Sequence, residues 1–234
     1  MSGIWVLIIL IIISSLPVAA VYVWFRLAKY QLSLIQFLLA LLLGAAALFP
    51  ALVLQDLINF SFSAAGRSQM LYEFFIRIAL TEELSRLLML FIFFWANSLI
   101  MKEDSINQDL TINKVKKATA IGLIAGLGFS ILESARYAAL QMDIGIVLLR
   151  IFTAAIHGAC GSRIGAAAVM FRSNPLQALL RILTAAAIHG VYNLMVTMSG
   201  ISSIAAILIA ISALITAILT IQGGWTLDKS SENT

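Results

Sequence analysis

Glutamates and histidines, side chains that often move protons in enzymes, stand inside apolar stretches of this 234-residue chain. Glu82 and Glu83 are adjacent, and His157 and His189 are the two histidines of the whole sequence. A carboxylate can act as a general base towards water, and an imidazole can hold or activate that water. Because burying an ionisable group is costly, these four residues predict acid–base chemistry or a fully paired polar network.

The spacing of neighbouring polar residues predicts how these groups are oriented. Glu82 and Arg86 are four residues apart and share one helix face, so we expect the arginine to fix that carboxylate. Glu83 lies about 100° further round the helix and is expected to remain free. His189 and Asn193 are also four residues apart, so an imidazole and a carboxamide project together. Such a pair of donors is suited to a developing oxyanion.

The composition determines which elements can position these residues. Hydrophobic residues make up 62% of the chain and charged residues 11%, whereas about a quarter of a soluble domain is charged. The chain is therefore predicted to be an all-α, polytopic helical membrane protein, one domain over residues 1–234, with the lipid bilayer as a partner and no nucleic acid. Cys160 is the single cysteine, so no disulfide and no cysteine-rich metal site is expected.

Seven stretches are long and apolar enough to span a bilayer, which takes about 20 residues each. The predicted spans are residues 4–25, 33–54, 75–100, 118–140, 145–170, 175–197 and 201–221. The third is interrupted by Glu82, Glu83 and Arg86, and it can begin with a surface-lying segment near Tyr72–Arg77.

The basic residues of the loops predict the orientation of these spans. One side of the predicted bundle carries Arg26, Lys29, Lys102, Lys114, Lys116, Lys117, Arg172 and Lys229, and the other carries Arg67 and Arg77. Since cytoplasmic loops are enriched in lysine and arginine, the N-terminus is predicted outside and the C-terminus in the cytoplasm.

Four spans are predicted to bring their titratable groups to one depth. Glu133, His157, His189 and the glutamate pair all fall roughly 10–18 Å below the outer surface, so we expect them to meet in a polar cavity. The alternative is a purely structural polar network, which stabilises the packing of the helices and has no catalytic role. Arg163 and Arg181 are expected to extend to the inner headgroups, and Arg136 and Arg150 to the outer ones. The GxxxG pairs Gly122/Gly126 and Gly161/Gly165 predict close helix packing.

Several motifs in order resemble those of the PrsW family of glutamic-type intramembrane proteases, which is related to the CPBP family with its CAAX endopeptidases. Glu82-Glu83-Leu-Ser-Arg86 resembles the EExxK/R motif, and the stretch Gly128–Tyr137 around Glu133 resembles the second motif. Arg150 with His157, and then His189-xxx-Asn193, resemble the third and fourth. Arg86 stands where lysine is frequent, and Ser134 where asparagine is common. The resemblance runs over residues 71–198.

The resemblance implies an endopeptidase that cleaves membrane-associated proteins with a glutamate-activated water, near the outer side of the membrane and without metal or cofactor. Its catalytic residues would be Glu82, Glu83, His157, His189 and Asn193, with Arg86 and Glu133 in support. It further implies a multi-pass protein of a bacterial or archaeal inner membrane, with an anti-sigma factor as one conceivable substrate.

Two other functions are compatible with the same residues. Chains of acids and histidines also serve as proton relays in coupled transporters, although the sequence has no paired Gly/Pro-broken helices of the kind that form midplane sites. A catalytically silent membrane scaffold or chaperone would retain the helices and the polar layer without the chemistry.

Overall fold

The computed structural model describes residues 3–30, 32–58, 66–101, 112–141, 144–198 and 201–231, and the regular structure in these ranges is entirely helical. Lys102 lies outside the described residues, as do the side chains of Arg150 and Lys229, so the predictions that rest on them are not addressed. The elements are α1 (Gly3–Leu27), α2 (Leu34–Ala46), α3 (Leu48–Leu57), α4 (Arg67–Leu71), the π-helix η1 (Tyr72–Leu80), α5 (Thr81–Met101), α6 (Ile112–Gln141), α7 (Ile144–Met170), α8 (Pro175–Thr197) and α9 (Ile201–Ser231).

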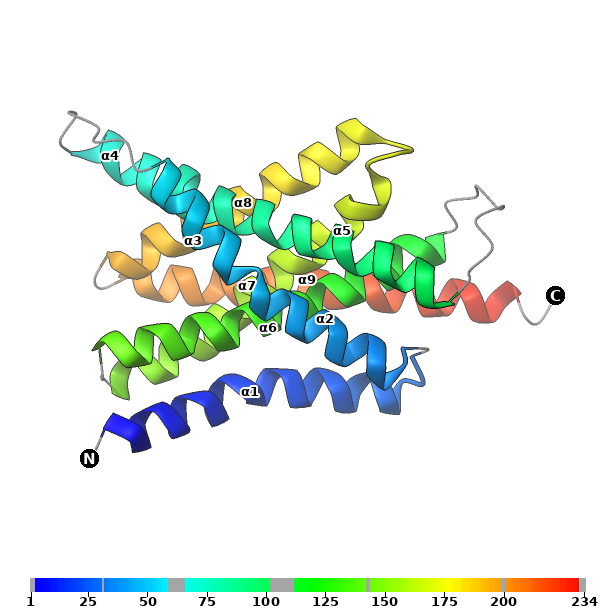
Figure 1. Ribbon diagram of the computed structural model, residues 1–234, viewed down its shortest axis with the longest axis horizontal. Helices are drawn as coiled ribbons and strands as arrows, with labels where there is room; N and C mark the ends of the chain where they lie inside the picture. The colour runs from blue at the N-terminus through cyan, green and yellow to red at the C-terminus, as the bar shows by residue number, and fades with distance from the viewer. Residues whose placement is uncertain are drawn as a thin grey trace.

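Each of the seven predicted apolar ranges is helical in its described residues. The helical stretches alternate in direction along the long axis of the molecule (Figure 1). Among the described residues, four stretches are long and apolar enough to cross a membrane: Leu34–Leu57, Lys114–Tyr137, Pro175–Thr197 and Ile201–Gln222. The start of α1 and the end of α9 lie at opposite ends of the bundle (Figure 1).

The stretch Leu34–Leu57 is interrupted between α2 and α3 at Ala47. Pro50 is the reason: it has no N–H to donate to the carbonyl of Ala46, four residues earlier, and its ring crowds that carbonyl. The interruption shifts α3 relative to α2, and α3 carries Gln55 to the vicinity of α5.

The third stretch is one continuous run of helix that begins at Arg67, earlier than the predicted start at residue 75. Helix α4 passes directly into η1, and η1 directly into α5. Thr81, the first residue of α5, directs its hydroxyl to the carbonyl oxygens of Arg77 at 2.6 Å and Ile78 at 3.0 Å. The wide π-helix ends at Leu80, two residues before Glu82.

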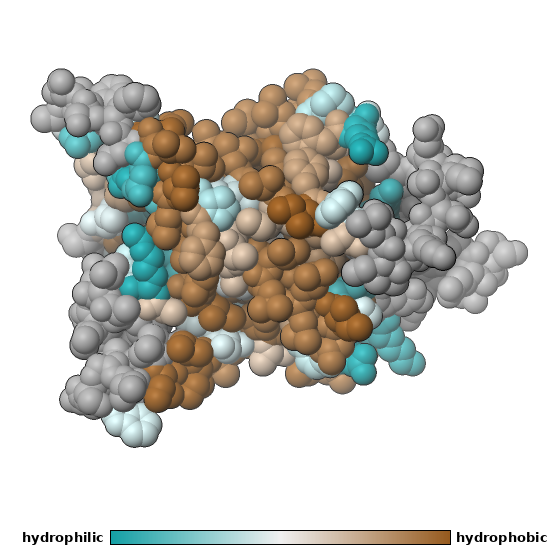
Figure 2. All heavy atoms as spheres, viewed as in Figure 1, coloured by the Kyte–Doolittle hydropathy of each residue, from teal (hydrophilic) through white to brown (hydrophobic). Residues whose placement is uncertain are grey.

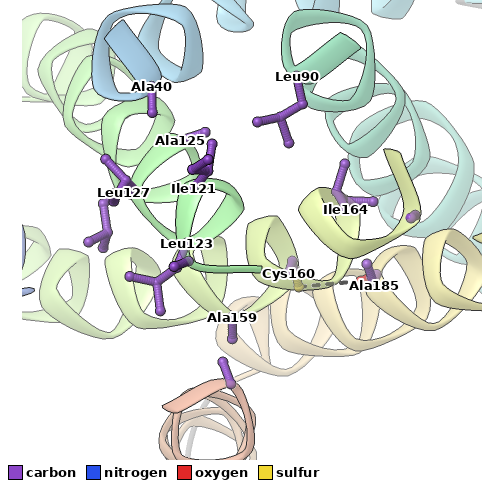
Figure 3. Packing of buried hydrophobic residues seen from close by; sticks show 14 of the residues in the cluster. Ala40, Leu90, Ile121, Leu123, Ala125, Leu127, Ala159, Cys160, Ile164 and Ala185 are labelled. Atoms are coloured by element: carbon purple, nitrogen blue, oxygen red, sulfur yellow. Dashed lines mark hydrogen bonds between the residues drawn. The ribbon is translucent and has the colours of Figure 1, made fainter. Parts of the chain in front are cut away.

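Helix α6 is the centre of the bundle, and 83% of its spanning window is buried. It packs most closely on α7, where the two GxxxG pairs face one another. A Cβ atom on Gly122 would collide with the carbonyl oxygen of Gly161, and one on Gly126 with that of His157. The predicted close packing is confirmed. The surrounding core is built of small and aliphatic side chains, among them Ala40, Leu90, Ile121, Leu123, Ala125, Ala159, Cys160 and Ile164 (Figure 3).

The surface and the interior have the polarity expected in a lipid solvent. Large apolar side chains such as Leu42, Phe49 and Trp95 are exposed, and apolar residues cover the middle of the view in Figure 2. Charged side chains such as those of Arg86 and Glu83 are instead fully buried. An apolar exterior around buried, paired charges is typical of membrane proteins, and the chain is a multi-pass membrane protein.

Candidate active site

Four helices bring their ionisable side chains into one buried group, which we call the polar cluster: Glu82, Glu83 and Arg86 from α5, Glu133 from α6, His157 from α7 and His189 from α8. The imidazole rings of the two histidines lie edge to face, with centroids 4.8 Å apart. The predicted meeting of glutamates and histidines from separate spans is therefore confirmed.

Glu83 is the tightly paired glutamate. Its Oε1 accepts hydrogen bonds from Arg86 Nη2 at 2.5 Å and from His189 Nδ1 at 2.9 Å. Glu82 lies further from the guanidinium, at 4.0 Å. The expectation that Arg86 fixes Glu82 and leaves Glu83 free is wrong. Glu83 is three residues before Arg86, a spacing that also places two side chains on one helix face, and the second bond from α8 selects it.

Glu133 holds the other histidine, as the sequence predicted. Its Oε2 lies 2.8 Å from Nε2 of His157, and both groups are buried. An imidazole that donates its Nε2–H to a carboxylate keeps an unprotonated Nδ1. Nδ1 of His157 is buried and has no hydrogen-bond partner in the described structure.

The carboxylates thus fix the tautomers of both histidines. Because His189 donates Nδ1–H to Glu83, its Nε2 carries a lone pair, and this atom lies 3.7 Å from Oε2 of Glu82. That oxygen also lacks a hydrogen-bond partner. Lone pairs of Glu82, His157 and His189 therefore converge in a buried space, where they repel one another unless a proton or a cation lies between them.

Arg86 joins the helices around the cluster. Besides the Glu83 carboxylate, its guanidinium contacts the carbonyl oxygen of His157 through Nη1 at 3.2 Å. Its Cζ atom lies 4.8 Å above the ring of Phe129 on α6, a cation–π contact. A single fully buried side chain therefore fixes α5 against α6 and α7.

Sequence reasoning missed Gln55. Its side-chain Nε2 donates to Oε1 of Glu82 at 3.4 Å. Its main-chain carbonyl oxygen accepts a hydrogen bond from Arg77 Nη1 at 3.5 Å. The available signal was a carboxamide next to a long apolar run, but Gln55 follows the predicted end of that span at residue 54. The structure extends the helix to Leu57 and so brings this amide to the glutamate.

Other predicted residues do not join the cluster. Asn193 lies one turn beyond His189 on α8, half-buried, and in the described part of the chain its side chain makes no hydrogen bond. On α7, Nη1 of Arg163 donates to the carbonyl oxygen of Ala159 at 2.9 Å. Arg163 and Arg181 instead line a cavity between α7 and α8.

The cluster has a donor set suitable for a divalent metal. One donor atom from each of Glu82, His157 and His189 lies within 4.8 Å of the others, and all three residues are buried. Two histidines and a glutamate form the ligand set of several catalytic zinc sites. In such sites each ligating imidazole donates its other N–H to a carboxylate, as His157 does to Glu133 and His189 to Glu83.

The polar cluster lies within the part of the chain that matches a known protein family. Neither the curated proteins nor the solved structures gave a match. A family profile described as "PrsW family intramembrane metalloprotease" matches residues 33–220, which include every member of the polar cluster. The match covers most of the chain and extends beyond the resembling motifs to α2 and α9. The chain is therefore a member of the PrsW family of intramembrane proteases.

Proposed function

We propose that this protein is a metal-dependent intramembrane endopeptidase whose metal is held by Glu82, His157 and His189. The observation that carries the proposal is the convergence of three buried lone pairs whose orientation is fixed by Glu83 and Glu133. A cation stabilises such an arrangement, and the low dielectric around it makes the stabilisation large. This proposal departs from the metal-free chemistry that the sequence predicted.

The donors fit a metal after a small movement. A tetrahedral site with zinc–ligand distances near 2.1 Å has donors about 3.4 Å apart. The present donors lie within 4.8 Å, so the side chains must draw together on binding. The hydrogen bonds to Glu83 and Glu133 keep the imidazoles oriented during this movement.

The residues of the site would have the following roles in peptide-bond hydrolysis. When bound, a divalent cation supplies a Lewis acid that polarises the peptide carbonyl and activates water. Oε2 of Glu83 is buried without a hydrogen-bond partner, so it is available to accept a proton. Arg86 holds the other oxygen of that carboxylate in place. Asn193 is half-buried with no competing hydrogen bond of its side chain, and it would donate to the developing oxyanion.

A glutamate-activated water without metal is the second candidate, and one observation favours it. Glu82 and Glu83 share one guanidinium, so the pair retains a negative charge that can act as a base without help from a cation. In that mechanism His189, whose Nε2 lies 3.7 Å from Glu82 Oε2, would stabilise the oxyanion together with Asn193.

Metal content and activity together separate the two mechanisms. We expect purified protein to contain stoichiometric divalent metal, to lose peptide cleavage on dialysis against a strong chelator, and to recover it with Zn²⁺. The purified variants Glu82→Gln and His157→Ala should contain no bound metal, as measured by elemental mass spectrometry. Glu73→Gln, outside the cluster, is the matched control and should retain both metal and cleavage.

Full activity after chelation, in protein without bound metal, would instead establish the glutamate mechanism. Absence of cleavage under every metal condition tested, together with normal folding, would favour the catalytically silent scaffold.

Membrane proteins are the proposed substrates, and the proposed site lies nearer the outer surface than the inner one. An anti-sigma factor is one such substrate that the position would suit. The proposed location is the inner membrane of a bacterium or archaeon, with the N-terminus outside and the C-terminus in the cytoplasm.

A further inference from the structure

A second polar site lies away from the polar cluster, between α7 and α8. A cavity of about 260 Å³ is lined by Arg163, Gln177, Leu180, Arg181 and Thr184. Both arginines are half-buried, and in the described part of the chain neither forms an ion pair with a carboxylate. Two guanidinium groups that share one cavity repel each other, so an anion between them would stabilise the arrangement.

The hydrogen bonds of the two arginines leave donors for such an anion. Arg163 contacts the carbonyl of Ala159 and, through Nη2, the hydroxyl of Thr216 on α9 at 3.3 Å. These are neutral acceptors, which leave the charge uncompensated. Nε of Arg181 is buried and has no hydrogen-bond partner in the described structure. Forked guanidinium groups suit bidentate contacts with phosphate oxygens.

The surroundings of the cavity are apolar on the side of α8. Leu180 lines the cavity and is 54% exposed, and Leu176, Leu179 and Leu183 continue this exposed apolar face. Arg163 lies seven residues before the end of α7, and Arg181 six residues after the start of α8. Both are therefore about 10 Å inside the helix ends, close to the depth at which lipid phosphates meet acyl chains.

We propose that this cavity binds an anionic phospholipid, whose phosphate is held by Arg163 and Arg181 and whose acyl chain lies along the leucines of α8. Basic pockets between helices near the cytoplasmic surface are known to bind lipid headgroups. A bound phosphate compensates both guanidinium charges and joins α7 to α8, the helices that carry His157 and His189. The lipid would therefore stabilise the pair of helices that presents both histidines.

The test measures lipid binding to the purified full chain in neutral detergent, by native mass spectrometry and by the shift in the melting temperature. The probes are phosphatidylglycerol, phosphatidylcholine and inorganic phosphate. We expect phosphatidylglycerol to bind most tightly and to raise the melting temperature. Arg163→Gln and Arg181→Gln should each weaken its binding about fivefold. Arg172→Gln removes a charge from the exposed turn that follows α7, outside the cavity, and should bind like the unmodified protein.

Arg181→Lys keeps the positive charge but replaces the forked guanidinium with an ammonium group. An affinity for phosphatidylglycerol between those of the unmodified protein and Arg181→Gln supports a bidentate contact. Equal binding of phosphatidylglycerol by unmodified protein and by both glutamine variants would overturn the proposal. Stabilisation by inorganic phosphate as large as that by the lipid, and lost in the same variants, would overturn the lipid assignment in favour of a soluble anion. The melting temperature without lipid shows whether each variant is folded.

Discussion

Glu82 and Glu83 are neighbours on α5, yet their carboxylates have different surroundings. Glu83 accepts hydrogen bonds from a buried arginine and from His189, whereas one oxygen of Glu82 has no partner and the other only a long contact with Gln55. Glu83 is therefore held in place through Oε1 and keeps Oε2 available for a proton, whereas Glu82 is available to a ligand.

The variants Glu82→Gln and Glu83→Gln should consequently differ in their effect on stability. Glu82→Gln removes a ligand or base while breaking no close ion pair, so we expect cleavage to fall by about 10²–10⁴ with the melting temperature nearly unchanged. Glu83→Gln removes the proposed proton acceptor and leaves the buried Arg86 charge with only the more distant carboxylate of Glu82, at 4.0 Å, so we expect loss of cleavage together with a loss of stability of about 3 kcal/mol. Thermal unfolding and cleavage assays on both variants check this, and equal destabilisation by the two would contradict it.

Asn193 offers a test of the predicted oxyanion contact. Asn193→Ala should slow turnover by about 10²–10³ while leaving substrate affinity and bound metal unchanged, because an oxyanion donor acts only in the transition state. Steady-state kinetics separate kcat from KM. An effect on KM alone would assign Asn193 to substrate binding.

The composition of the site could be predicted from the sequence, but its pairing could not. Ionisable residues in apolar spans are few, so Glu82, Glu83, His157 and His189 were recognisable at once. Which glutamate Arg86 pairs with depends on a rotamer and on a second donor from α8, and helical spacing allows both choices. Gln55 was missed because span limits from hydropathy are uncertain by a few residues.

At the scale of the helices, the contact between α6 and α7 determines the depth and spacing of the site. Glu133 and His157 form a hydrogen bond across it, and Gly126 allows the backbones to approach at the level of His157. GxxxG pairs made this contact predictable. The π-helix η1 was not predictable, since the residues of η1 have no pattern that distinguishes it from an α-helix.

A matched pair of glycine substitutions tests this contact. Gly126→Ala places a methyl group against the His157 carbonyl and should destabilise the protein by about 1–3 kcal/mol, with loss of cleavage. In Gly158→Ala the new methyl group would meet the flexible side chains of Leu127, at 3.3 Å, and Leu123, at 3.8 Å, and no backbone atom, so stability should change little. Melting temperatures in detergent compare the two, and equal effects would show that close α6–α7 packing is not required.

For the whole molecule, the predicted orientation can be tested on exposed serines at opposite ends of the bundle. Ser173 follows α7 at the end that gathers the basic residues, and Ser68 lies on α4 at the other end (Figure 1). Cys160 is fully buried, so it gives little background labelling. In intact cells an impermeant thiol reagent should label Ser68→Cys and not Ser173→Cys. The reverse pattern would invert the topology and move the site towards the cytoplasm.

The hydrogen bond between His189 and Glu83 joins residues 106 positions apart in the chain. During synthesis, α5 enters the membrane long before α8 has left the ribosome. A nascent or prematurely terminated chain therefore holds the glutamates without the second histidine, and under the proposed mechanism it would not hydrolyse its neighbours in the translocation machinery. In the proposed mechanism, the order of the helices would therefore delay proteolytic competence until α8 has been synthesised and inserted.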